Sequence, residues 1–138
     1  MNWLSHFLFY TYIGLVLLAG FWGAFINPYF DFRFLIELDP QSLNEHVRAN
    51  LFSQYRFLRA LELGFGLFSI RFVHNIFHEK AFNSLFLVIM GSGILARIVS
   101  WIIEGPPNKF HLFFMFYELI GFVIIYLHTR KNLSQHAG

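Results

Sequence analysis

The stretch LARIVSWIIEGPP, residues 95–107, places one arginine and one glutamate in an otherwise apolar segment that ends in two prolines. Arg97 and Glu104 are seven residues apart, so they share one face of a helix. Paired prolines cannot continue that helix, and we expect the segment EGPPNK to be a turn. The stretch therefore predicts a helix that carries a charge in apolar surroundings and stops at this turn.

The composition of the whole chain is that of a membrane protein. Of 138 residues, 57% are hydrophobic, 21% are aromatic and 13% are charged, whereas soluble domains have about 25% charged residues. The absence of cysteine excludes disulfides, thiolate metal sites and cysteine-based catalysis. The formal charge of +2 comes from few residues, and no basic block with interleaved aromatic residues predicts binding of nucleic acid.

Apolar segments long enough to cross a bilayer, which needs about 20 residues, occur four times. They are residues 3–26, 51–73, 81–103 and 110–127. We expect the first to be a retained span and not a signal peptide, because no Lys or Arg precedes it and no small-residue cleavage site follows it. The second is the least apolar, since three charges interrupt it. The chain therefore predicts an all-α fold: one integral membrane four-helix bundle over residues 1–138, with a partly helical first extramembrane loop.

The charges of these segments fall in one half of the expected bundle. If the N-terminus lies on side A of the membrane, segments two and four begin on side B and segment three ends there. A charge near the bilayer centre costs about 2.5–3.5 kcal/mol when unpaired, and the guanidinium fork suits a carboxylate. We therefore expect an interhelical network, or a ligand-binding site, formed by Arg56, Arg59, Glu62, Arg97, Glu104 and Glu118. Supporting hydrogen-bond donors nearby are Trp101, Tyr117 and Tyr55.

The segments that carry these charges resemble a known family. The second span contains RFLRALELGFGLF, the third contains GSGILARIVSWIIEGPP and the fourth contains FYELIGF. Over about residues 54–127, this pattern resembles DUF4345, a family of small bacterial four-span membrane proteins without an assigned activity. The resemblance implies the four-span fold and a bacterial origin, and it supplies no mechanism. The charged first loop, residues 27–50, is larger than expected of that family.

The first loop contains its own helix signals. Asp39 followed by Pro40 is typical of an N-cap and a first helical residue, so we expect a helix to start there and run into the second span. Residues 30–36 are too apolar for a freely solvated loop. An interfacial connection is the favoured interpretation, and a lid over the mouth of the bundle is the alternative.

Orientation follows from the lysines and arginines at the ends of the spans. Side A holds Arg71, Lys80, Arg130 and Lys131, and side B holds Arg33, Arg48 and Lys109. By the positive-inside rule this small excess favours both termini in the cytoplasm. We therefore expect a multi-pass protein of the bacterial inner membrane whose charged half opens to the periplasm.

Histidines form a second constellation at the side-A ends of the spans, made of His6, His74, His78 and His128. His74 and His78 are one helical turn apart, a spacing that suits a metal or haem. Glu79 is the only carboxylate nearby, and an interfacial position explains the histidines without a ligand. We therefore predict no metal site and no cofactor.

Three functions are compatible with the charged half. The first is structural: an accessory or assembly subunit of a membrane complex, with lipids and other membrane subunits as partners. The second is binding of a lipid or quinone-like amphiphile in an outward-facing cavity. The third is an isomerase-type membrane enzyme in which Glu62 or Glu118 moves a proton. We rank them in that order and assign no catalytic residue.

Overall fold

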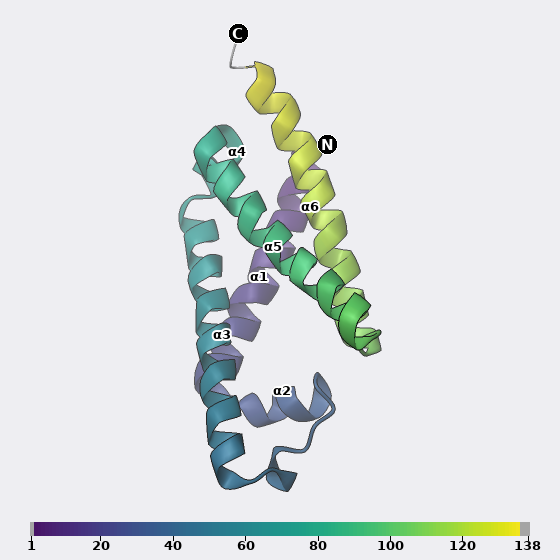
Figure 1. The fold of residues 1–138 in the computed structure, drawn as a ribbon. Coiled ribbons are helices and arrows are strands. Elements are labelled where there is room, and N and C mark those ends of the chain that lie inside the picture. The colour runs from purple at the N-terminus through teal and green to yellow at the C-terminus, as the bar shows by residue number, and fades with distance from the viewer. Residues whose placement is uncertain (1, 136–138) are drawn as a thin grey trace. The chain divides into compact units, whose positions relative to one another are not determined.

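The computed structural model describes residues 2–135, and every regular element in that range is a helix (Figure 1). The chain divides into two compact units. Unit 1 consists of Met1–Ile13 and Ser69–Gly138, and unit 2 consists of Gly14–Phe68. The all-α prediction is confirmed for the described residues.

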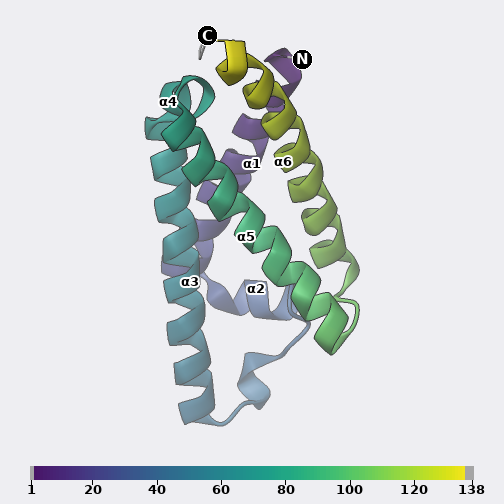
Figure 2. The ribbon, with the colours of Figure 1, turned by 45° about the horizontal axis from the view of Figure 1, so that its top comes forward.

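Unit 2 contains the end of one long helix, most of another and the segment that connects them. Its elements are α1 (Asn2–Phe21, which begins in unit 1), the π-helix η1 (Trp22–Ile26), α2 (Pro28–Phe34), the 3₁₀-helix η2 (Pro40–Ser42) and α3 (Glu45–Arg71, which ends in unit 1). In both views α2 runs across the direction of α3 (Figures 1 and 2). The connecting segment is therefore folded against the long helices, and it is partly helical as predicted.

Close approach of α1 to α3 requires glycine at position 20. A Cβ atom on Gly20 would lie 2.7 Å from the backbone nitrogen of Leu63 and 2.9 Å from the carbonyl oxygen of Arg59. Real Cβ atoms do not approach backbone atoms this closely. The absence of a side chain thus allows the two backbones to meet, as small residues do in membrane helix pairs.

Capping residues determine where the short helices of unit 2 begin. The Asn27 side chain accepts from the backbone N–H of Phe30, with Pro28 as the first residue of α2. Asp39 caps η2 by accepting from the N–H of Gln41, as expected. The expectation that this helix runs into the second span is wrong, because η2 ends at Ser42 and α3 starts separately at Glu45. Asn44 precedes α3, and its side chain accepts from the backbone N–H of His46.

Unit 1 contains the remaining helices. They are α4 (Val73–His78), α5 (Lys80–Glu104) and α6 (Lys109–Gln135). The link between the second and third segments is thus mostly helical. The predicted turn after α5 is confirmed: Gly105 has a φ of 100°, and the Asn108 side chain starts α6 by accepting from the N–H of His111.

The core of unit 1 is aromatic near the start of α1. Phe9 packs edge-on against Phe77, with ring centroids 5.4 Å apart, and contacts Phe86 at 5.3 Å. Asn83 is buried beside these rings and donates to the carbonyl oxygen of Ile76, 2.9 Å away. The Thr129 hydroxyl lies 3.3 Å from the Asn83 side-chain oxygen. Aromatic packing therefore joins α1 to α4 and α5, and the polar contacts of Asn83 join α5 to α4 and α6.

Candidate membrane spans agree with three of the four expected segments. Trp3–Ile26, Lys80–Glu104 and Lys109–Lys131 are long and apolar enough to cross a bilayer, which is compatible with a membrane protein. Among the described residues α3 does not reach the same apolarity, because Arg56, Arg59 and Glu62 lie in its middle. Three candidate spans are therefore present.

Alanine substitutions at two glycines of α1 should have opposite effects. Gly14 has open space where a Cβ would lie, and Gly20 does not. Gly14→Ala should stabilise the helix by up to about 1 kcal/mol through helix propensity, whereas the clash in Gly20→Ala should cost about 1–3 kcal/mol. The measurement is unfolding of the purified protein by sodium dodecyl sulfate titration. Equal effects of the two substitutions would contradict the close approach of α1 to α3.

Candidate functional site

A cluster of charged side chains joins α2 to α3 in unit 2. We call it the Arg59 cluster: Asp31, Tyr55, Arg59 and Glu62. The Tyr55 hydroxyl donates to Asp31 Oδ2 at 2.6 Å and accepts from Arg59 Nε at 2.8 Å. Arg59 Nη1 donates to Glu62 Oε2 at 2.6 Å, and Arg59 Nε lies 3.7 Å from Asp31 Oδ2. One guanidinium thus holds two carboxylates and a phenol.

Local sequence explains how these groups meet. Tyr55 and Arg59 are four residues apart on α3, and Glu62 follows three residues later, so all three share one face. Asp31 lies in the first turn of α2, where the helix dipole favours a carboxylate. At position 23 a Cβ would lie 2.7 Å from Arg59 Cγ and 2.9 Å from Asp31 Oδ2, so Gly23 leaves the space that the pair occupies.

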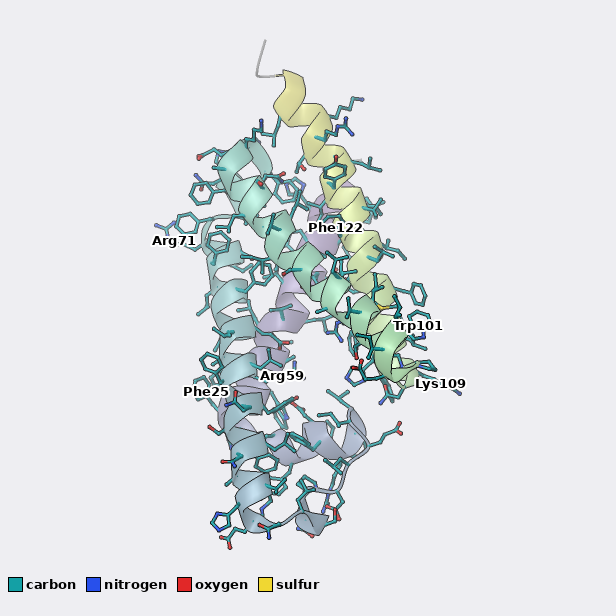
Figure 3. All side chains as sticks on the ribbon, viewed as in Figure 1. Phe25, Arg59, Arg71, Trp101, Lys109 and Phe122 are labelled. Carbon is teal, nitrogen blue, oxygen red and sulfur yellow. The ribbon has the colours of Figure 1, made fainter. Side chains whose placement is uncertain are left out.

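Burial is deepest at the centre of this cluster. The side chains of Asp31 and Arg59 are 7% and 15% exposed, and that of Glu62 is 31% exposed. Arg59 projects from α3 within unit 2 (Figure 3). A buried ion pair is stable only when hydrogen bonds replace the lost water. Arg59 donates to Tyr55 and Glu62, and Asp31 accepts from Tyr55, so hydrogen bonds are present on both sides of the pair.

Arg56 has a different partner from the one we expected. Its guanidinium donates to the backbone carbonyl of Ala24 in η1. Carbonyl groups at the end of a helix lack an intrahelical donor, and a cation there satisfies them. Arg56 therefore caps the end of the first apolar segment.

The second ion pair lies in unit 1 and joins α5 to α6. Arg97 Nε is 3.2 Å from Glu118 Oε2, and the two side chains are 37% and 15% exposed. The neighbouring Tyr117 hydroxyl shares a hydrogen bond with the hydroxyl of Thr11 on α1. Polar contacts thus join α1 to α6 and α6 to α5 within this unit.

The predicted site residues therefore form two groups, and four of them, Arg56, Tyr117, Glu104 and Trp101, belong to neither. Arg59 and Glu62 pair with support from Tyr55, and Arg97 pairs with Glu118. Glu104 is exposed at the end of α5, and no ion pair of Glu104 is seen among residues 2–135. Trp101 is also exposed, close to the turn where Lys109 begins α6 (Figure 3). Convergence of all six charged residues at one depth stays a prediction.

Sequence reasoning missed Asp31. It lies in the segment that we interpreted as an interfacial connection, and its partners are 24 and more residues away. The available signal was the helix start Asn27-Pro28 followed by an acid, which places a carboxylate in a first turn. The same reasoning also missed the buried pair Asn83 and Thr129.

The histidines of the predicted side-A group contact other aromatic rings. His6 stacks on Phe77 with centroids 4.1 Å apart and lies 6.2 Å from the ring of His128. His74 and His78 stack at 4.3 Å. In the described part of the chain, no group of three or more His, Cys, Asp or Glu side chains is placed to hold a metal ion.

A comparison with family models decides the family. The model described as a domain of unknown function, DUF4345, matches residues 3–128, nearly the whole chain. The chain belongs to the DUF4345 family. No curated protein and no solved structure matches it. The match includes both ion pairs and the first loop, so the Arg59 cluster lies inside the family's domain.

Substitution of two aspartates compares the contribution of a buried and an exposed carboxylate to the stability of unit 2. Asp31 is buried in the Arg59 cluster, whereas Asp39 pairs with Arg33 at 3.2 Å with both side chains about half exposed. Asp31→Asn removes a charged hydrogen-bond acceptor and should cost about 1.5–3 kcal/mol. Asp39→Asn should cost less than about 1 kcal/mol. Unfolding of both variants in detergent measures the difference in their free energies of unfolding. Equal stabilities would contradict the role of the Arg59 cluster in holding α2 against α3.

Proposed function

We propose that the protein is an accessory or assembly subunit of a complex in the bacterial inner membrane. On this proposal the charged side chains hold its own helices in place, and its outer apolar faces contact other membrane subunits and lipid. The observation that carries the proposal is that the carboxylates of both ion-pair groups are engaged by arginine.

Engagement by arginine argues against a catalytic role for these groups. Asp31 and Glu62 share Arg59, and Glu118 contacts Arg97. A carboxylate that works as an acid or base needs lone pairs within reach of the substrate, and in each of these three an arginine contacts one of the two oxygen atoms. Binding of an amphiphile beside the charges and isomerase-type catalysis remain hypotheses of lower rank for this reason.

The outer faces of α5 and α6 support contact with other helices. Only 17% of the residues in the most apolar part of each helix are buried. On α5 the exposed small residues Gly93, Ala96 and Ser100 follow one another at helical spacing, and nothing lies within 4 Å of a Cβ built on Gly93. Small residues allow close approach of a neighbouring membrane helix. We therefore place the proposed interface on this face of α5.

We further propose that α3 is a fourth span. It has 27 residues, which at about 1.5 Å per residue gives about 40 Å, enough to cross a hydrocarbon core of about 30 Å. The pairing of Arg59 and the capping by Arg56 reduce the cost of placing these charges in a bilayer. Four spans bring both ends of this chain to one side of the membrane, and the positive-inside rule places that side in the cytoplasm.

Reporter fusions distinguish four spans from three. Green fluorescent protein and alkaline phosphatase, fused in turn to each end of this chain, should both report the cytoplasm. Reporters inserted after Glu37 and after Pro106, both exposed positions outside the long helices, should report the periplasm. Ends on opposite sides of the membrane would show three spans and contradict the fourth.

A leucine on the open face of α5 should abolish assembly. Gly93→Leu meets no internal atom near its Cβ, so the chain should fold, while a partner's helix is kept away. The assembled fraction, measured by blue native electrophoresis at native expression level, should fall at least about tenfold, since a bulky residue at such a contact disrupts close packing. Gly64→Leu, at an equally open glycine of α3, is the matched control and should assemble normally.

Two outcomes would contradict the accessory role. One is a wild-type protein that migrates as the isolated chain or as an assembly of this chain alone. The other is an equal effect of the two leucine substitutions.

A further inference from the structure

An open groove runs between α5 and α6 in unit 1, and no residue of either ion-pair group is among the described residues that line it. Its volume is about 720 Å³. Its walls are mostly apolar and come from both helices, with Leu87, Val88 and Leu95 on α5 and Phe122 and Tyr126 on α6. It therefore presents an apolar channel between two candidate spans.

Small residues on α5 create this groove. Gly91 and two serines, Ser84 and Ser92, line it where larger side chains would fill the space. A Cβ on Gly91 would lie 3.3 Å from the ring of Phe122, which Figure 3 labels on α6, so the two helices are in contact there. The contact of Asn83 with Thr129 joins the helices again, eight residues before Gly91 on α5. The groove is thus bounded by fixed contacts between α5 and α6.

The groove matches one leaflet of a bilayer in length. Its lining on α5 extends from Lys80 to Leu95, which at about 1.5 Å per residue is about 22 Å. One leaflet with its headgroup region is about 20–22 Å thick. The groove is therefore long enough to hold one extended acyl chain from the headgroup region to the middle of a bilayer.

Two cations stand at one end of the groove. Lys80 and Arg130 both line it, at the first residue of α5 and near the end of α6. The Arg130 guanidinium is 5.9 Å from the centre of the Tyr126 ring, and its Nη1 lies 3.4 Å from the Tyr126 hydroxyl. Neither cation forms an ion pair within the described range. Glu79, which precedes Lys80, instead accepts from the side chain of Asn75.

The charges that line the groove favour an anionic lipid over a zwitterionic one. Among residues 2–135 no Asp or Glu lines the groove, so no carboxylate of that range would pair with the ammonium group of a zwitterionic headgroup. Lysine and arginine at the end of a span attract the phosphate of an anionic lipid. We propose that this groove binds one anionic phospholipid, with its phosphate between Lys80 and Arg130 and one acyl chain along Leu87, Val88 and Phe122. This site is separate from the interface of the proposed accessory role.

Lipid titration followed by native mass spectrometry tests the site. Purified wild-type protein should bind dioleoyl phosphatidylglycerol more tightly than dioleoyl phosphatidylcholine, which has the same tails. The double variant Lys80→Gln/Arg130→Gln should weaken binding of the anionic lipid about 25-fold, roughly fivefold for each cation. Lys131→Gln is the matched control, because Lys131 follows Arg130 and does not line the groove, and it should change affinity less than about twofold.

A second pair of variants tests the apolar part and keeps the cations. Ser92→Trp fills the groove, and Ile102→Trp places the same ring at another exposed position of α5 that neither lines the groove nor belongs to the proposed interface. Ser92→Trp should abolish the preference for the anionic lipid, and Ile102→Trp should retain it. Glycerol phosphate, which has the headgroup chemistry without tails, should not displace the lipid.

Three results would overturn the proposal. The first is equal binding of the two lipids by the wild-type protein. The second is an equal effect of Lys131→Gln and the double variant, which would indicate general surface charge. The third is displacement by glycerol phosphate as effective as that by the whole lipid, which would indicate a site for phosphate alone. None of these results bears on assembly through Gly93.

Discussion

A buried guanidinium carries a full charge and five N–H donors that must find partners once water is removed. Arg59 donates to Tyr55 and Glu62 on its own helix, and it pairs at 3.7 Å with Asp31 of α2, which accepts from the Tyr55 hydroxyl. The short helix α2 is held in this position because its first-turn carboxylate is one of the partners. Gly20 and Gly23 allow this arrangement, since a side chain at either position would collide with α3 or with the ion pair. The packing of unit 2 therefore depends on satisfying one cation.

The same requirement recurs throughout the described chain. Arg56 satisfies a carbonyl oxygen at the end of the first apolar segment, and Asn83 satisfies one in α4. No buried side-chain nitrogen or oxygen atom lacks a partner among the residues described. In a bilayer an unsatisfied polar group costs several kcal/mol, so a protein with this composition places each polar side chain where a partner is available. Asn27, Asn44 and Asn108 do the same for backbone N–H groups at helix starts.

The charged side chains of the described chain fall into two kinds with different proposed roles: those paired with an opposite charge, and those beside the groove between α5 and α6. Paired charges hold helices of one unit together, and every carboxylate of the two ion-pair groups contacts an arginine. The groove between α5 and α6 differs, because its cations Lys80 and Arg130 have no carboxylate partner among the described residues and stand beside an apolar channel. Partner helices and lipid would therefore use separate parts of unit 1: the open face around Gly93, and the groove that ends at Lys80.

The sequence by itself determined the helices, since an apolar run of 20 or more residues bounded by Pro, Gly and Asn leaves few other options. It placed the turn after Glu104 and the cap at Asp39, because both depend on neighbouring residues. It also placed Tyr55, Arg59 and Glu62 on one face of α3, since helical spacing is local. The break at Phe72 that separates α4 from α3 gave no such signal. Tertiary structure alone decided that Asp31 meets Arg59, that Arg56 caps Ala24, and that small residues on α5 leave a groove against α6. These contacts join residues far apart in the chain, so they depend on how the helices pack, which no local pattern encodes.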